Sequence, residues 1–299
     1  LLLCHGRNEY RRMSTLVYYV FYKAFLLTCI LFWYLPYNAS TGQKFYLEAA
    51  YQTYNFVYAG VPILVYAFND FDVVDSVARQ VPQLYHLGVR RVYSGYGLAG
   101  RWALVGIAES LVIFFFTVAA LDNTTRSGET AGVWQIGDYC FAQVMMVVTG
   151  KLCLLSYQMS RWQHGILFVN LLLWWPLDWI GGLDATQLNA WTAPLAEGYL
   201  GMFWQVQSTA SFWLTLLLVP ITVLLPQYAW VTYRRLFTPI LRDLVMEAEW
   251  HQNSAAKEAI MQYEIPAADR EMRLHKNAPR PIEPPSLMDR LRGRGRVAA

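Results

Sequence analysis

The chain is poor in charge and in cysteine, and both shortages narrow the classes of protein to which it can belong. Only 15% of its 299 residues are Asp, Glu, Lys or Arg, against about a quarter in an ordinary soluble domain. The net charge of +3 is too small and too scattered for a nucleic-acid-binding surface, so no nucleic-acid partner is expected. The four cysteines have no CxxC spacing, so neither a zinc site nor a disulfide framework is indicated.

Several motifs of soluble enzymes are also missing. The sequence contains no phosphate-binding P-loop, no HExxH metal pair and no GxSxG nucleophile elbow. One GxGxxG match, at Gly95–Gly100, fails on its context, because no buried strand precedes it and a long apolar run follows. The first residue is Leu1 rather than Met, and no signal peptide precedes the apolar runs, so we expect the chain to be a piece of a longer protein.

Apolar residues, by contrast, are abundant and lie in long uninterrupted runs. Hydrophobic residues make up 56% of the chain and aromatic residues 16%. About 20 apolar residues suffice to cross roughly 30 Å of hydrocarbon as a helix, and lipid cannot satisfy the backbone groups of other structures. The sequence therefore predicts an all-α membrane domain over residues 1–231. Its transmembrane helices, about six in number, are expected at residues 14–35, 51–68, 101–121, 136–155, 165–183 and 208–230.

The distribution of Lys and Arg predicts the orientation of these spans. Basic residues gather before the first span, after the second, after the fourth and after the sixth, whereas the opposite loops contain only Lys44 and Arg126. By the positive-inside rule, both ends of the chain are cytoplasmic. Two N-glycosylation sequons, at Asn38 and Asn123, fall on the predicted exoplasmic side, although such short sequons also arise by chance.

Residues 232–299 have the composition of a soluble segment and are predicted to form a cytoplasmic tail. Apolar and charged residues alternate in a helix-like way over Thr238–Glu264, which predicts a short helix. The Pro-rich stretch Pro266–Pro285 is expected to be extended and disordered. The basic cluster Arg290–Arg296 is either a solvated end or a contact with anionic lipid.

A few polar groups lie inside the apolar runs, where a charge costs about 2.5 to 3.5 kcal/mol at the bilayer centre. Lys23 lies near the middle of the first span, and either a structural pairing or a role in coupling or substrate passage would explain it. Glu109 is an intramembrane acid in the third span, and a structural partner or a place in the bundle interior explains it as well as a function does. Lys151 is near the end of its helix and is expected to snorkel. Asn55 and Pro62 predict that the second span is kinked or locally unwound, as in the binding sites of transporters.

Several short motifs follow one another in the first ninety residues. They are His5–Ser14 (HGRxxYxRxS), Phe21–Lys23 (compare FYKN), Gly42–Gln43 (the end of NGFSGQ), Tyr54–Asn55, Asp70–Val73 (compare DQDV) and Pro82–Gly88 (PxLYxxG). In this order and spacing, they resemble the motifs around the fifth and sixth membrane helices of the type IV P-type ATPases, the phospholipid flippases. The later part of the chain resembles that family mainly in its number of spans, so the resemblance implies helices five to ten of such a pump.

The resemblance implies a pump in which ATP phosphorylates an aspartate of a cytoplasmic domain. Dephosphorylation is then coupled to moving aminophospholipid-type lipids from the exoplasmic to the cytoplasmic leaflet. The DKTGT, DGET and GDGxND motifs of that chemistry are absent from this chain, so ATP and Mg²⁺ would bind elsewhere in the full-length protein and no catalytic residue or metal ligand is expected here. The resemblance also implies an accessory β-subunit with two transmembrane spans, and a multi-pass location in a Golgi, endosomal or plasma membrane.

Residues on the substrate path or in coupling follow from the same resemblance. Lys23 matches the Lys of FYKN and follows Tyr22, Asn38 and Thr41 match the Asn and Ser of NGFSGQ, and Asn55 matches the polar start of the sixth helix. If Asn38 contacts a lipid headgroup, it is not also glycosylated.

The chain departs from the family pattern at Ala24, Ser40, Ala59 and Glu109–Ser110, where an Asn, a Phe, a Thr and a His-Ser pair are usual. These departures are compatible with an altered headgroup preference or a loss of transport. A truncated or degenerate module that binds lipid or the accessory subunit without pumping therefore stays open as an alternative. A P-type cation pump fits less well, because it needs several grouped carboxylates and Glu109 has no clear acidic partner in the first two spans.

Overall fold

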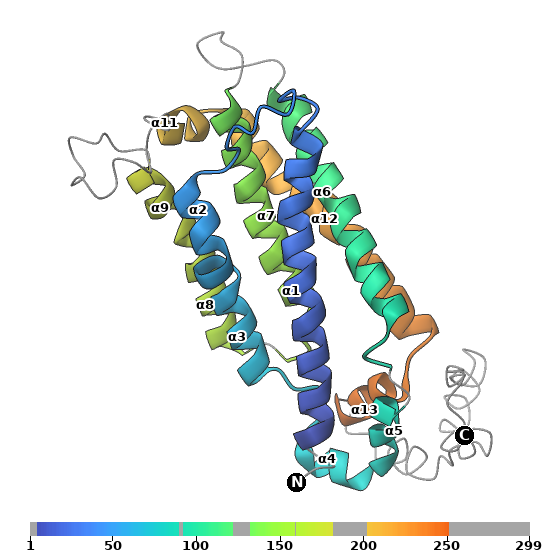
Figure 1. The fold of residues 1–299 in the computed structure, drawn as a ribbon. Coiled ribbons are helices and arrows are strands. Elements are labelled where there is room, and N and C mark those ends of the chain that lie inside the picture. Colours follow the sequence, from blue (N-terminus) through green and yellow to red (C-terminus); the bar gives the residue numbers. More distant parts are fainter. Residues whose placement is uncertain (1–4, 90–91, 122–131, 159, 182–201, 251–299) are drawn as a thin grey trace, which may run out of the picture. The chain divides into compact units, whose positions relative to one another are not determined.

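The computed structural model describes residues 5–89, 92–121, 132–158, 160–181 and 202–250 (Figure 1). Within these ranges all regular structure is helical, which confirms the all-α prediction for this part of the chain. The chain divides into two compact units. Unit 1 comprises residues 1–14, 71–95 and 227–299, and unit 2 comprises residues 15–70 and 96–226.

Four of the described helices are long and apolar enough to cross a membrane. They are α1 (Arg7–Tyr34), α6 (Tyr96–Leu121), α7 (Val133–Leu155) and α12 (Ala210–Phe237). They correspond to the predicted spans at 14–35, 101–121, 136–155 and 208–230. Helices α1 and α12 extend well beyond the apolar runs, because charged residues at their outer ends are compatible with helix.

The other two predicted spans are built from shorter helices. Residues 51–68 fall in α2 (Glu48–Thr53), the π-helix η2 (Tyr54–Tyr58) and α3 (Gly60–Asn69), so the predicted local unwinding of this segment is confirmed. Residues 165–183 fall in α8 (Arg161–Leu172) and α9 (Trp174–Gly181), and the last two lie outside the described residues. A short helix, α11 (Met202–Gln207), precedes α12.

Helix α7 forms the centre of unit 2. In its most apolar stretch 72% of the residues are buried, the largest share among the four long helices. The Phe141 ring stacks on Trp174 with 4.8 Å between ring centroids, and it meets Tyr54 edge-on at 5.8 Å. At Gly137 the backbone of α7 lies so close to the chain after α1 that a Cβ there would be 1.9 Å from the Phe45 carbonyl oxygen. A side chain at this position would separate the two segments.

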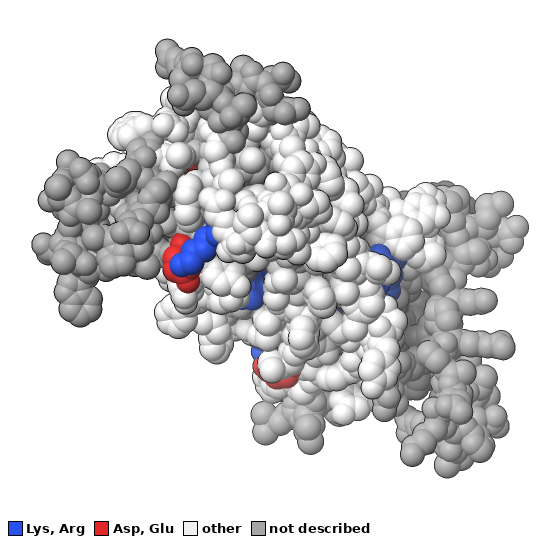
Figure 2. All heavy atoms as spheres, turned by 45° about the horizontal axis from the view of Figure 1, so that its top comes forward, with Lys and Arg blue, Asp and Glu red and all other residues white. Residues whose placement is uncertain are grey.

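The outward faces of the long helices are apolar. Leu104 on α6 and Leu214 on α12 are each 68% exposed, and Leu217 and Leu225 on α12 are also exposed. Figure 2 shows one face of the protein on which charged side chains are few and the described surface is otherwise uncharged. Exposed apolar side chains in this number are typical of contact with lipid or with further protein.

Unit 1 is assembled from segments far apart in the sequence. It contains the first turns of α1, the helices α4 (Asp75–Gln80), η3 (Pro82–Tyr85) and α5 (His86–Val89), the end of α12, and α13 (Leu241–Trp250). Leu241 and Val245 of α13 join a small core whose other members are Val73, Val77, Ala78, Val81, Leu84 and Leu87. The helix predicted within Thr238–Glu264 is thus present as far as Trp250, and the rest of the tail lies outside the described residues.

Candidate functional site

The middle of α1 carries a buried cation beside the break in the second helical segment. Lys23 is 5% exposed, and its ammonium lies 5.9 Å from the centre of the Tyr54 ring in η2. The Tyr54 hydroxyl donates to the backbone carbonyl of Lys23 at 3.1 Å. In the described part of the chain no carboxylate pairs with the Lys23 ammonium, so this cation is held next to an aromatic ring rather than neutralised.

The π-helix η2 follows from the residues that come after it. Pro62 has no N–H to donate and its ring clashes with the carbonyl four residues earlier, so it fits best in the first turn of a helix. Helix α3 accordingly restarts at Gly60, and the Ala59 N–H reaches back five residues to the Tyr54 carbonyl at 2.9 Å. π-Helical turns of this kind occur frequently at functional sites.

Another helix donates a hydrogen bond to a backbone carbonyl at the break. In the π register, the carbonyl of Val57 would accept from residue 62, which is a proline. The side-chain amide of Asn170 on α8 donates to this carbonyl at 3.1 Å, and Asn170 is buried. The two interrupted segments, α2–η2–α3 and α8–α9, are thereby joined at the point where the first is irregular.

Asn55 is exposed on η2, next to Phe56, whose side chain is 83% exposed. No described contact joins Asn55 to Lys23, although its neighbour Tyr54 contacts Lys23. Tyr54 and Asn55 are neighbours in the same turn, but the first is buried and the second is exposed. Tyr54 faces the core and α1, while Asn55 presents an amide on the surface.

A second buried charge cluster lies where α1, α6 and α7 meet, and it contains Tyr22 and Glu109. The Lys151 ammonium of α7 donates to one Glu109 carboxylate oxygen at 3.0 Å, and the Tyr22 hydroxyl donates to the other. Lys151 is 5% exposed and Glu109 6%. The expectation that Lys151 snorkels is therefore wrong, because a buried carboxylate on the neighbouring helix compensates its charge. The structure thus provides a structural partner for Glu109.

Asn38 and Thr41 contact each other in the turn that follows α1. The Thr41 hydroxyl donates to the side-chain oxygen of Asn38, which is half-buried, and the Thr41 N–H donates to the Asn38 carbonyl at 3.0 Å. The turn between them places Ala39 at φ 44° and Ser40 at φ 59°, a left-handed conformation that is costly for residues other than glycine. No described contact joins this turn to Lys23 or Asn55, and the second sequon, at Asn123, lies outside the described residues.

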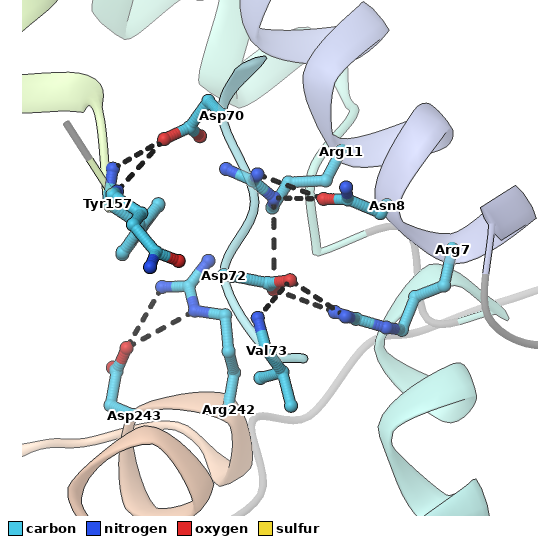
Figure 3. A network of polar contacts seen from close by, with 10 residues as sticks. Arg7, Asn8, Arg11, Asp70, Asp72, Val73, Tyr157, Arg242 and Asp243 are labelled. Carbon is cyan, nitrogen blue, oxygen red and sulfur yellow. Dashed lines mark hydrogen bonds and ion pairs between the residues drawn. The ribbon is translucent and has the colours of Figure 1, made fainter. Parts of the chain in front are cut away.

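In unit 1, two motif residues form a buried ion pair (Figure 3). Both terminal nitrogens of Arg7 donate to the Asp72 carboxylate at 2.7 Å, and the Arg11 guanidinium lies 3.7 Å from the same carboxylate. Burial alone would raise the pKa of the Asp72 carboxyl. The hydrogen bonds and charge of Arg7, together with the charges of Arg11 and Arg242, hold that pKa below its ordinary value. Asp72 is therefore ionised and fixes the start of α1 on the segment that follows α3.

Asp70 has a separate role within unit 2 (Figure 3). It is fully buried, and its carboxylate accepts from the backbone N–H groups of Tyr157 at 2.8 Å and Gln158 at 3.2 Å. It thereby satisfies donors in the connection between α7 and α8. The two acids of the Asp70–Val73 motif thus hold different segments, which spacing alone does not indicate.

The structure brings together Tyr22 with Glu109, Asn38 with Thr41, and Lys23 with the turn of η2 that contains Asn55. The pairing of Lys151 with Glu109 and the contact of Asn170 with Val57 are not indicated by the sequence. Asn170 lies in an apolar run near no motif, so only its polarity could have drawn attention to it. Within the described residues no group of His, Cys, Asp and Glu is suited to hold a metal ion.

Comparison with known proteins gives a consistent result. Residues 1–240 match the family described as "Phospholipid-translocating P-type ATPase C-terminal". The chain is 28% identical over 251 residues to phospholipid-transporting ATPase C887.12 of Schizosaccharomyces pombe, covering 83% of this chain and 20% of that protein. It is 26% identical over 267 residues to phospholipid-transporting ATPase DRS2 of Saccharomyces cerevisiae, covering 88% and 19% respectively. The chain thus spans about a fifth of the length of these curated relatives.

Proposed function

We propose that this chain is the membrane part of an ATP-driven phospholipid pump. The reason is that the chain belongs to the phospholipid-translocating P-type ATPases and forms their C-terminal region. The complete pump moves aminophospholipid-type lipids from the exoplasmic to the cytoplasmic leaflet. P-type ATPases use ATP and Mg²⁺, which would bind to domains outside this chain. The chain contributes about six membrane crossings, of which α2–η2–α3 and α8–α9 are the two interrupted ones.

The observation that carries this proposal is the buried cation of Lys23 beside η2. A charge inside a membrane helix is costly, and it is retained where it pairs or acts on a pathway. Lys23 has an aromatic neighbour at 5.9 Å and no carboxylate partner among the described residues, so it is available to a phosphate or to a group that approaches during the cycle. Interrupted membrane helices are also where transporters place their binding sites.

A lipid headgroup is as costly to move through hydrocarbon as a protein charge, so a pump of this kind needs a polar route while the acyl chains stay in lipid. We assign Asn55 and the Asn38–Thr41 turn to this route, and Lys23 with Tyr22 to coupling. Lys23 would favour one conformation of the cycle by making different contacts in each, as a coupling residue must.

The test is the substitution Lys23→Ala in the complete protein with its accessory subunit. We expect lipid-stimulated dephosphorylation to slow more than phosphorylation does, measured by formation and decay of the radiolabelled phosphoenzyme. Lys44→Ala is the matched control, because Lys44 forms an exposed ion pair with Glu48 and should leave both rates unchanged. Decay at the wild-type rate in Lys23→Ala would discard the coupling role, and absence of a phosphoenzyme in the wild type would favour the non-pumping module.

Topology and partners are part of the same proposal. The protein is multi-pass, in a Golgi, endosomal or plasma membrane, with both ends of this chain cytoplasmic and an accessory β-subunit of two spans beside it. A reporter fused after Ala299 should be active only on the cytoplasmic side, and exoplasmic activity would overturn this orientation.

A further inference from the structure

The cluster of Tyr22, Glu109 and Lys151, called here the triad, joins three helices of unit 2 through a single carboxylate. Besides its hydrogen bond to Glu109, the Lys151 ammonium lies 3.8 Å from the centre of the Tyr22 ring and 5.3 Å from that of Trp102. The Trp102 ring meets the Tyr22 ring edge-on at 5.8 Å. Tyr22 is fully buried. Its hydroxyl bonds to the Glu109 carboxylate and its ring face lies against the Lys151 ammonium.

The charges of the triad compensate each other. Glu109 and Lys151 are almost completely buried, and a buried charge is costly when its oppositely charged partner is removed. An ammonium bound to a carboxylate in this way is not free to bind a lipid phosphate. The triad therefore holds the three helices together and is not a part of the lipid route.

One residue of the triad, Tyr22, directly precedes the proposed coupling cation in the sequence. Tyr22 and Lys23 are neighbours on α1, so their side chains leave the helix about 100° apart and one faces the triad while the other faces Tyr54. Any rotation of α1 about its axis that displaces Tyr22 displaces Lys23 by the same angle. By holding Tyr22, the triad restrains the rotation of α1 and with it the direction in which the Lys23 side chain leaves the helix.

A close approach of α1 and α6 allows Tyr22 and Glu109 to meet. A Cβ added at Gly106, one turn before Glu109, would lie 3.3 Å from the Tyr22 Cδ2 atom and 3.5 Å from its carbonyl oxygen. One residue beyond Glu109, the buried Ser110 accepts from the Trp33 indole N–H at 3.0 Å. Helix α1 is thus held against α6 on both sides of the triad.

From these contacts we propose that Glu109 and Lys151 are positioning residues, which act through Tyr22 to set the orientation of Lys23 during the pump's cycle. This inference rests on the proposed function, in which Lys23 couples dephosphorylation to lipid movement. It assigns to Glu109, which departs from the family pattern, a partner and a purpose distinct from headgroup choice.

The decisive variant is Tyr22→Phe in the complete protein with its accessory subunit. It removes only the hydroxyl and leaves the Glu109–Lys151 pair in place, so the protein should fold. We expect lipid-stimulated turnover per phosphoenzyme to fall about tenfold, less than the roughly hundredfold loss that a 1 Å displacement can cause at a reacting centre. The lipid concentration at half-maximal rate should be unchanged, because the triad does not touch lipid.

The matched control is Tyr19→Phe. Tyr19 is also fully buried on α1, one turn earlier, but its hydroxyl donates to the backbone carbonyl of Val148 at 3.2 Å rather than to the triad. We expect Tyr19→Phe to turn over like the wild type. Equal losses in the two variants would overturn the proposal, because they would show a general packing effect.

Combination with Lys23→Ala separates positioning from structure. If Glu109 acts through Lys23, Glu109→Gln should lower turnover in the wild type but cause no further loss in the Lys23→Ala protein. Losses that multiply would show that Glu109 acts independently of Lys23 and would overturn the proposal.

A wild type without lipid-stimulated ATP hydrolysis would instead refute the proposed function. An active wild type that is insensitive to both Tyr22→Phe and Glu109→Gln would refute the positioning role alone.

Discussion

Helices α7 and α12 are both apolar enough to cross a membrane, yet they are buried to opposite extents. The most apolar window of α7 is 72% buried, against 28% for that of α12. Helix α7 turns Gln143, Thr149 and Lys151 inward, whereas α12 exposes Leu217 and Leu225. Hydrocarbon cannot solvate polar groups, and apolar side chains gain little by leaving it. In this protein the more polar of the two helices is therefore the one at the centre.

The largest expected effect is the loss of the buried charge pair on α7. Lys151→Met removes the cation that pairs with the buried Glu109 carboxylate, and we expect the free energy of unfolding to fall by about 3 to 5 kcal/mol. The measurement is unfolding of the purified protein in mixed micelles of a mild detergent and SDS.

Lys44→Met is the control for this prediction, because Lys44 also pairs with a glutamate, at 2.9 Å, but on the surface. Exposed pairs contribute about 0 to 1 kcal/mol. A similar effect of the two substitutions would mean that the interior around α7 is hydrated, and the contrast between the two helices would then not hold.

The same leucine truncation on both helices tests the comparison directly. Leu152 on α7 is 1% exposed and Leu217 on α12 is 64% exposed. We expect Leu152→Ala to cost about 2 to 3 kcal/mol through the cavity it leaves, and Leu217→Ala less than about 0.5 kcal/mol. Unfolding in the same micelles measures both. A larger loss for Leu217→Ala would indicate that this face of α12 is covered by protein rather than lipid.

Much of the fold could be predicted because apolar run length is a strong physical constraint. The runs at 14–35, 101–121, 136–155 and 208–230 each lie in a long helix, and Pro62 correctly indicated the interruption in the second segment. The motifs before residue 90 also identified the family that the comparisons show. Run length does not, however, determine which face of a helix is buried.

The site was less predictable, because it depends on which helices are neighbours. Position in the sequence made Lys151 look like a residue that reaches the membrane surface, since no linear pattern pairs it with Glu109, 42 residues earlier. The contact of Asn170 with the Val57 carbonyl likewise depends on α8 lying beside η2. Lys23 was identified by its depth in the membrane and by the family resemblance, and Tyr22 by the resemblance alone. Only the structure shows that the two side chains have different surroundings.

A smaller effect is expected from filling the close contact at Gly137 on α7. Gly137→Ala would place a methyl group 1.9 Å from the Phe45 carbonyl oxygen, so the backbone must shift. Overpacking typically costs about 1 to 3 kcal/mol, and the better helix propensity of alanine returns up to about 1 kcal/mol. We expect a net loss of about 1 to 2 kcal/mol by the same unfolding measurement. Gly100→Ala on α6, with nothing within 4 Å, should be neutral or stabilising, and a loss there would contradict the steric explanation.

The smallest effect is expected where α7 meets α12 itself. A Cβ at Gly150 would lie 2.4 Å from Leu224 Cδ1, the end of a flexible side chain on α12 that can move aside. The strain and the gain in helix propensity should nearly cancel, so Gly150→Ala should change the free energy of unfolding by less than about 0.5 kcal/mol. In a Leu224→Ala background the clash is absent, and Gly150→Ala should become stabilising by up to about 1 kcal/mol. The same unfolding titrations measure both values, and an equal effect in the two backgrounds would show that α12 does not limit the space beside α7 at this point.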